Sequence, residues 1–241
     1  MTASRLARAR SVLADTRPLK VPAFRRLWIA DIVTVIGAQL SVVAVPAQIY
    51  EVTGSSAYVG LTGVFGLVPL VVFGLWGGAL ADVVDRRTLL IITTVGLIVC
   101  SALFWAQAAA GGQNVWIVLV LFAVQQAFFA VNQPTRTAVL PRLLDAKDLP
   151  AALSLNMTVM QFGAIVGPLL AGFLLNWVDL STLYLIDAVT CLAPIWATFR
   201  LAPIPPVSTE QGSSRWGLTA VLDGFRYLAG NTVVLMSFVV D

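Results

Sequence analysis

The sequence carries little charge. Lys, Arg, Asp and Glu together account for 11% of its 241 residues, and hydrophobic residues account for 59%. A soluble globular domain has about 25% charged residues. This composition, with a mean hydropathy of +0.88, therefore indicates an integral membrane protein. Histidine is absent, so any proton relay in this chain has to use carboxylates.

Cysteine is also scarce. Cys100 and Cys191 each lie inside an apolar run without metal-ligand spacing, so both are expected to be small buried hydrophobic residues. The sequence shows no nucleophile–base set and no phosphate-binding loop, and we expect neither enzymatic activity nor a cofactor or metal. The basic residues flank apolar runs instead of forming one face, which argues against nucleic acid as a partner.

Six long apolar runs make up most of the sequence. Each is close to the roughly 20 residues that a helix needs to cross hydrocarbon about 30 Å thick. The predicted spans are residues 27–50, 58–81, 88–110, 115–133, 153–176 and 182–199. The predicted fold class is therefore an all-α integral membrane protein, a six-helix transmembrane bundle in a lipid bilayer.

The basic residues predict the orientation. With the N-terminus inside, all 15 Lys and Arg residues fall in the tail 1–26, the connections 82–87 and 134–152, or beyond residue 199. The outward connections contain only Glu51 and Asp179 as charged residues. The positive-inside rule therefore predicts a multi-pass protein of the cytoplasmic (inner) membrane with its N-terminus in the cytoplasm.

The region after the sixth span has a different character. Residues 200–230 are expected to form a cytoplasmic linker with an amphipathic helix at 215–230. Residues 231–241 are apolar but too short to cross the bilayer at about 1.5 Å per residue. They are expected to begin a seventh span, whose missing remainder would belong either to a longer chain or to a partner protein.

A short internal repeat occurs at an offset of 94 residues, the difference between positions 78 and 172. Gly78, Leu80, Val84 and Asp85 recur as Gly172, Leu174, Val178 and Asp179. Three helices repeated in the opposite topology are the 3+3 inverted repeat of transporter folds. A chance match is the alternative for so short a pattern.

Two motifs carry a resemblance to a known family. The run Gly78-Ala-Leu-Ala-Asp82-Val-Val-Asp85-Arg86-Arg87 resembles the signature between helices two and three of the major facilitator superfamily. It departs from that signature at Val83, where a basic residue is usual, and at Asp85, where glycine is usual. In span five, the residues that resemble the drug–proton antiporter signature of the same superfamily are Gly163, Gly167, Pro168 and Gly172.

Other segments resemble the siderophore-exporter and multidrug-efflux branch, among them Phe24–Trp28 and Pro150–Asn156. The resemblance implies the N-terminal half of a twelve-helix transporter. Such a protein would export an amphipathic small molecule, a drug or a siderophore, by alternating access and proton antiport. The alternatives are a uniporter or importer of the same fold, and a half-length membrane protein that does not transport or that assists a partner.

The resemblance also implies a role for the charged turn. Asp82 would cap a helix of the other half and Arg86 would brace it, as a latch for the outward-facing state. Alternatively, Asp82, Arg86 and Arg87 only anchor the turn in water. Gly78 would allow a close helix approach there, as Gly163 and Gly167 would in span five, where Pro168 permits a kink.

Polar residues inside the spans are candidates for the substrate or proton path, because hydrocarbon makes them costly. Asp31 either binds a proton during antiport or pairs with Arg25 and Arg26 at the interface. By resemblance, helices one, two, four and five line a central cavity. The candidates for substrate contact are Gln39, Gln125, Asn132 and Asn156.

Span four carries a polar stripe. Gln125, Asn132 and Arg136 follow one helical face at spacings of seven and four residues. Hydrogen bonds between helices are the alternative explanation for such a stripe. Asp187, in span six, is expected to be structural, since the resemblance places that helix at the periphery of its bundle.

Overall fold

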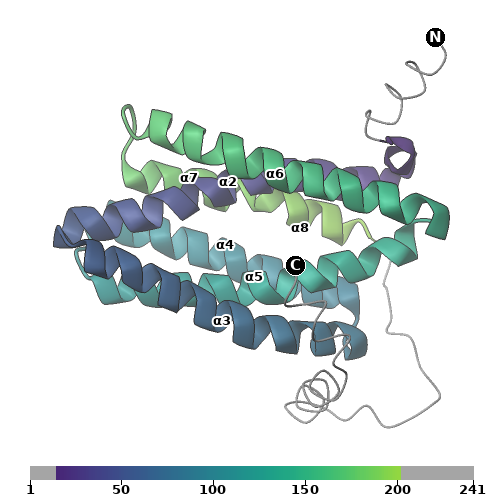
Figure 1. Ribbon diagram of the computed structural model, residues 1–241, viewed down its shortest axis with the longest axis horizontal. Helices are drawn as coiled ribbons and strands as arrows, with labels where there is room; N and C mark the ends of the chain where they lie inside the picture. The colour runs from purple at the N-terminus through teal and green to yellow at the C-terminus, as the bar shows by residue number, and fades with distance from the viewer. Residues whose placement is uncertain (1–14, 202–241) are drawn as a thin grey trace, which may run out of the picture.

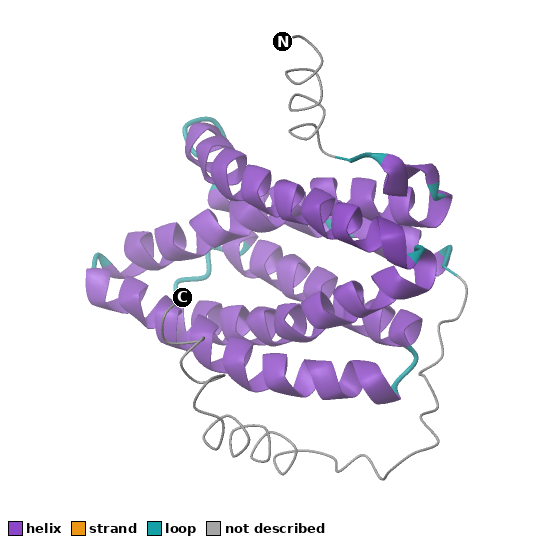
Figure 2. Cartoon of the chain, turned by 45° about the vertical axis from the view of Figure 1, so that its right-hand side comes forward, coloured by secondary structure: helices purple, strands orange, loops and turns teal. Residues whose placement is uncertain are grey.

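The computed structural model describes residues 15–201, except for the side chains at positions 78, 79 and 81–83. Every regular element in this range is a helix (Figure 2). The α-helices are α2 (Pro22–Thr53), α3 (Ser56–Val83), α4 (Arg86–Ala109), α5 (Val115–Leu143), α6 (Leu149–Leu174), α7 (Leu180–Thr190) and α8 (Leu192–Phe199). Two 3-10 turns accompany them, η1 (Arg17–Lys20) and η2 (Ala146–Asp148). The predicted linker beyond residue 201, its amphipathic helix and the seventh span lie outside the described residues.

Six segments of the described chain are long and apolar enough to cross a membrane, and α7 with α8 forms the sixth. Large apolar side chains cover the outer surface, for example Leu169, 70% exposed, and Phe173, 62% exposed. A water-soluble surface would not gather so many, whereas lipid chains solvate them at little cost. The fold is therefore an all-α membrane bundle, as the sequence predicts.

The helices form two groups that exchange partners. α2 packs against α6, α7 and α8, whereas α5 packs against α3 and α4 (Figure 1). α4 and α7 meet between the two groups. If α2–α4 and α5–α8 are the two repeats, the first helix of each repeat packs on the second and third segments of the other. This reciprocal exchange agrees with the predicted inverted repeat.

The turn between α3 and α4 is tighter than the connection predicted at 82–87. α3 ends at Val83 and α4 begins at Arg86. Asp85 caps α4: its Oδ1 accepts hydrogen bonds from the Thr88 backbone N–H at 2.8 Å and from the Thr88 hydroxyl at 3.0 Å. Such a cap is worth about 1 kcal/mol. We call this side of the molecule the Asp85 end, and the side that carries the α2–α3 turn the Gly54 end.

α5 continues through Pro134 and Pro141 to Leu143, although its span is predicted to end at residue 133. Proline is a good stop signal in soluble helices, but membrane helices tolerate it because neighbouring helices and hydroxyl groups satisfy the freed backbone groups. Arg136 therefore lies on α5 with Gln125 and Asn132, although the predicted connection 134–152 includes its position.

The sixth span is interrupted between α7 and α8 at Cys191. Pro194 explains the break, because it has no N–H to donate to the carbonyl of Thr190 four residues earlier. That carbonyl instead lies 3.4 Å from the hydroxyl of Thr34 on α2. The irregular backbone therefore occurs where α7 faces another helix, and not where it faces lipid.

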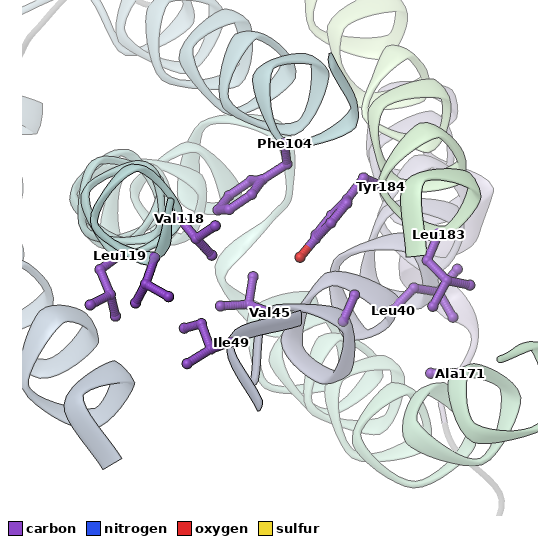
Figure 3. Packing of buried hydrophobic residues seen from close by; sticks show 11 residues of the cluster. Leu40, Val45, Ile49, Phe104, Val118, Leu119, Ala171, Leu183 and Tyr184 are labelled. Atoms are coloured by element: carbon purple, nitrogen blue, oxygen red, sulfur yellow. The ribbon is translucent and has the colours of Figure 1, made fainter. Parts of the chain in front are cut away.

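The largest buried apolar cluster lies toward the Gly54 end, where α2, α4, α5, α6 and α7 converge. Its labelled members in Figure 3 are Leu40, Val45, Ile49, Phe104, Val118, Leu119, Ala171, Leu183 and Tyr184. The rings of Phe104 and Tyr184 stack with centroids 5.0 Å apart and planes inclined by 15°. Two smaller clusters, around Phe24 and Leu27, close the Asp85 end.

Candidate functional site

A cavity of about 460 Å³ lies between these clusters, lined by α2, α4, α5, α6 and the α7–α8 segment. Small-molecule sites in proteins usually have volumes of roughly 300–1,000 Å³. The lining is amphipathic, with Phe122, Phe129 and Met157 beside amides and hydroxyls. Its charged side chains are Asp31, Arg136 and Asp187.

Asp31 and Arg136 form an ion pair that joins α2 to α5. Their side chains are 15% and 20% exposed. Asp31 is therefore paired as one sequence interpretation expects, but with Arg136 and not with Arg25 and Arg26. Both members of the pair line the cavity. Charged side chains in the interior of a helical bundle are stabilised when each is paired with the opposite charge.

The rest of the stripe on α5 contacts α4. Asn132 Nδ2 donates to Thr93 Oγ1 at 2.7 Å and lies 3.3 Å from Thr94 Oγ1. Gln125 Nε2 is 3.4 Å from the hydroxyl of Ser101, a longer contact. Both amides also line the cavity. Interhelical bonding and cavity lining, offered by the sequence as alternatives, therefore coexist in these residues.

Gln39 on α2 and Asn156 on α6 reach the same cavity. Asn156 Oδ1 is buried and has no hydrogen-bond partner among the described residues. A buried acceptor without a donor is costly, and a donor on a bound molecule would satisfy it. The structure thus brings every predicted cavity residue of the spans to one space.

Two glycines of the span-five motif permit the close approach of α6 to α2. A Cβ atom at Gly163 would collide with Val35 Cγ1, and one at Gly167 would collide with Gln39 Cβ. Gly172 has open space around it, so the last glycine of the motif faces no neighbouring helix of residues 15–201. Pro168 lies inside α6 and is partly buried.

Replacing Gly163 or Gly167 with alanine is therefore expected to destabilise the bundle by at least about 1 kcal/mol through overpacking. Gly172→Ala is the matched control, because alanine favours helix by up to about 1 kcal/mol and meets no obstacle there. Thermal unfolding of the detergent-solubilised variants measures the difference. Equal stability of all three would contradict the close-approach role.

The charged turn is described only in part. The surroundings of Gly78 and the side chain of Asp82 lie outside what the structure describes, so the predicted latch is not visible. Arg87 Nη2 donates to the Phe199 carbonyl at 3.0 Å, at the C-terminus of α8. A cation is favourable at that end of a helix. This contact ties the α3–α4 turn to the sixth span.

Asp187 is the residue whose position the sequence interpretation missed. It is fully buried, and its Oδ2 accepts hydrogen bonds from Ser41 at 2.6 Å and Ser101 at 2.8 Å. The thiol of Cys191 is 3.8 Å from the other oxygen, Oδ1. The sequence did contain a signal for this position, because a carboxylate inside an apolar span is by default a candidate functional residue. Its helix faces α2 and α4 at this point and is not peripheral.

A second polar cluster lies closer to the Gly54 end than the cavity does. The side-chain amides of Gln48 on α2 and Gln107 on α4 bond reciprocally, at 2.8 and 3.2 Å. The hydroxyl of Tyr184 donates to Gln48 Oε1 at 2.9 Å. These three side chains link α2, α4 and α7 above the cavity. No group of three or more metal-ligating side chains occurs in residues 15–201.

The sequence profile of a family described as transmembrane secretion effectors matches residues 13–240. The chain therefore belongs to the transmembrane secretion effector family. This family is part of the major facilitator superfamily of transporters, which confirms the predicted superfamily. The six-helix fold fits the N-terminal half of a major facilitator transporter.

Curated relatives of this chain include exporters. An enterobactin exporter of Salmonella choleraesuis is 28% identical over 228 residues, which cover 88% of this chain and 51% of the relative. The staphyloferrin A transporter of Staphylococcus aureus is 24% identical over 77% of this chain and 47% of the relative. A macrolide efflux protein of Streptococcus pyogenes is 25% identical over 69% of this chain and 41% of the relative. The chain spans about half the length of the curated relatives it matches.

Proposed function

We propose that the protein exports an amphipathic small molecule across the cytoplasmic membrane by alternating access, in exchange for protons. The observation that carries this proposal is the amphipathic cavity at the centre of the bundle, in a chain whose family members include exporters of siderophores and of macrolides. Aromatic and methionine side chains suit the apolar part of such a molecule. Amides such as Gln39 and Asn156 suit its polar groups.

The proposal includes a second six-helix half, because inverted-repeat transporters open and close one bundle against another around a central site. Its source is either the same polypeptide or a partner protein. The N-terminus and the Asp85 end face the cytoplasm, which the distribution of Lys and Arg supports. Asp82 latches the two halves in the outward-facing state, with Arg86 bracing it.

Everted membrane vesicles from cells expressing the protein test this function. A pH-sensitive dye reports the gradient of an energised vesicle, and a macrolide or enterobactin is then added. Proton antiport predicts that adding the substrate lets protons leave the acidified vesicle, and so lowers the gradient, only when the protein is present. Labelled substrate that equilibrates without any effect of the gradient would identify a uniporter instead.

In the same vesicles, Asp82→Asn is expected to slow export at unchanged protein level. The slowing would reach up to roughly 30-fold, because a carboxylate at a helix N-terminus is worth up to about 2 kcal/mol. Asp179→Asn is the control, since Asp179 is exposed and lies in another connection. An Asp82→Asn rate equal to wild type would refute the latch and leave the export function standing.

A further inference from the structure

Asp187 has an unusual set of neighbours for a buried carboxyl group. Among the described residues it forms no ion pair, and its hydrogen-bond partners are two serine hydroxyls, the thiol of Cys191 and the side-chain amide of Gln125. Both hydroxyls, from Ser41 and Ser101, bind the same oxygen, Oδ2. An ionised carboxylate held in this way lacks a counter-ion, whereas a neutral carboxyl group does not need one. The hydrogen-bond donors favour the ionised carboxylate and burial favours the protonated form, so the site can hold either form.

The other oxygen has a partner that fits two protonation states. Cys191 Sγ, 3.8 Å from Oδ1, is a weak donor and a weak acceptor. It can donate to an ionised Oδ1 or accept from a protonated one, while the two serines keep their bonds to Oδ2. A proton can therefore bind and leave at Oδ1 without rearranging the three helices that meet there.

Because the other charges around Asp187 cancel, its protonation state sets the net charge of the cavity lining. Asp31 on α2 and Arg136 on α5 pair with one another, so their charges cancel. α4 and α6 contribute no charged residue to the cavity. Tyr184 and Cys191 are the titratable neighbours on its own segment. The net charge of the cavity lining is therefore zero when Asp187 is protonated and minus one when it is ionised.

We propose that Asp187 is the proton-binding site of the cavity, and that its ionised form makes the cavity a site for a singly charged cationic amphiphile. On deprotonation the O–H bond at Oδ1 breaks, the proton passes to water entering the cavity, and the electron pair stays on the carboxylate. The cationic molecule then restores neutrality. Proton and substrate exclude one another electrostatically, which deepens the export function proposed above and rests on it.

The test uses the protein in lipid nanodiscs and tetraphenylphosphonium as the cationic probe. Wild type is expected to bind it more tightly as pH rises, by about tenfold per pH unit across the titration, because one proton leaves for each cation bound. Calorimetry in buffers of different ionisation enthalpy counts that proton. Triphenylphosphine oxide, an uncharged analogue, is expected to bind without pH dependence.

Asp187→Asn is expected to abolish both the pH dependence and the proton release, and to weaken binding at high pH at least tenfold. The control Asp179→Asn makes the same substitution at an exposed carboxylate just before α7, and should behave as wild type. The carboxylic acid band in the infrared spectrum gives a second readout: it should titrate in wild type and vanish in Asp187→Asn. If that variant loses its helical circular dichroism, Asp187→Glu replaces it, and the band should shift in frequency.

Proton release that persists in Asp187→Asn, or wild-type binding that ignores pH, would overturn this assignment. So would a wild type that binds the uncharged analogue as tightly as the cation at high pH. The outcome is separate from the vesicle experiment. Proton-linked binding without export would refute the transport function alone, and export without proton-linked binding would refute the role of Asp187 alone.

Discussion

Arg136→Gln is expected to lower the free energy of unfolding by about 3–5 kcal/mol, because it leaves the carboxylate of Asp31 inside the bundle without its cation. The two side chains are mostly buried, so water in the cavity replaces the lost partner only in part. For a protein of this length, such a loss corresponds to a decrease of order 10 °C in Tm. Thermal unfolding in detergent, followed by helical circular dichroism, measures it.

The double variant Asp31→Asn/Arg136→Gln distinguishes the effect of an unpaired charge from the effect of changed side-chain shape. It removes both charges at nearly unchanged volume, so most of the lost stability is expected to return. Arg142→Gln is the control, because Arg142 is an exposed arginine on the same helix. A double variant as unstable as Arg136→Gln would show that the ion pair is not the cause.

The six spans could be predicted from the sequence because the thickness of hydrocarbon dictates how many apolar residues a helix needs. The residues at which the helices end could not be predicted in this way. α2 begins at Pro22 and α5 ends at Leu143, both beyond the predicted spans. Hydropathy detects the part of a helix in hydrocarbon, whereas hydrogen bonds continue the helix into the polar region beyond it.

The contacts within the cavity were harder to predict, because they depend on which helix faces which. The spacing of Gln125, Asn132 and Arg136 correctly placed them on one face of a helix. One interpretation of the sequence paired Asp31 with Arg25 and Arg26, which are its neighbours along the chain. The pairing with Arg136 depends on the packing of α2 against α5, which the sequence does not reveal.

Asp187 shows a second limit of the same kind. In a helix that is apolar on every side, periodicity does not reveal the face that meets the other helices. The resemblance to a known fold placed this helix at the periphery, and its carboxylate was therefore read as structural. The serines that bind this carboxylate lie on α2 and α4, 146 and 86 residues away in sequence, so neither contact is local.

Tyr184→Ala is expected to cost about 2–3 kcal/mol of stability, because the buried ring stacks on Phe104 where α2, α4 and α7 meet (Figure 3). The expected cost is below the roughly 3–5 kcal/mol usual for aromatic residues in soluble cores. In a bilayer or micelle the unfolded helix keeps its ring in hydrocarbon, so the transfer term is small and the lost packing dominates.

Tyr184→Phe isolates the hydroxyl group, and it should cost only about 1 kcal/mol, because Gln48 Oε1 still accepts from Gln107 Nε2 at 2.8 Å. Phe173→Ala, which removes an exposed ring, should change stability by about 0.5 kcal/mol or less. Unfolding temperatures of the three variants rank these contributions. If Tyr184→Phe lost as much stability as Tyr184→Ala, the hydrogen bond to the glutamine pair, and not ring packing, would be the main contribution of Tyr184.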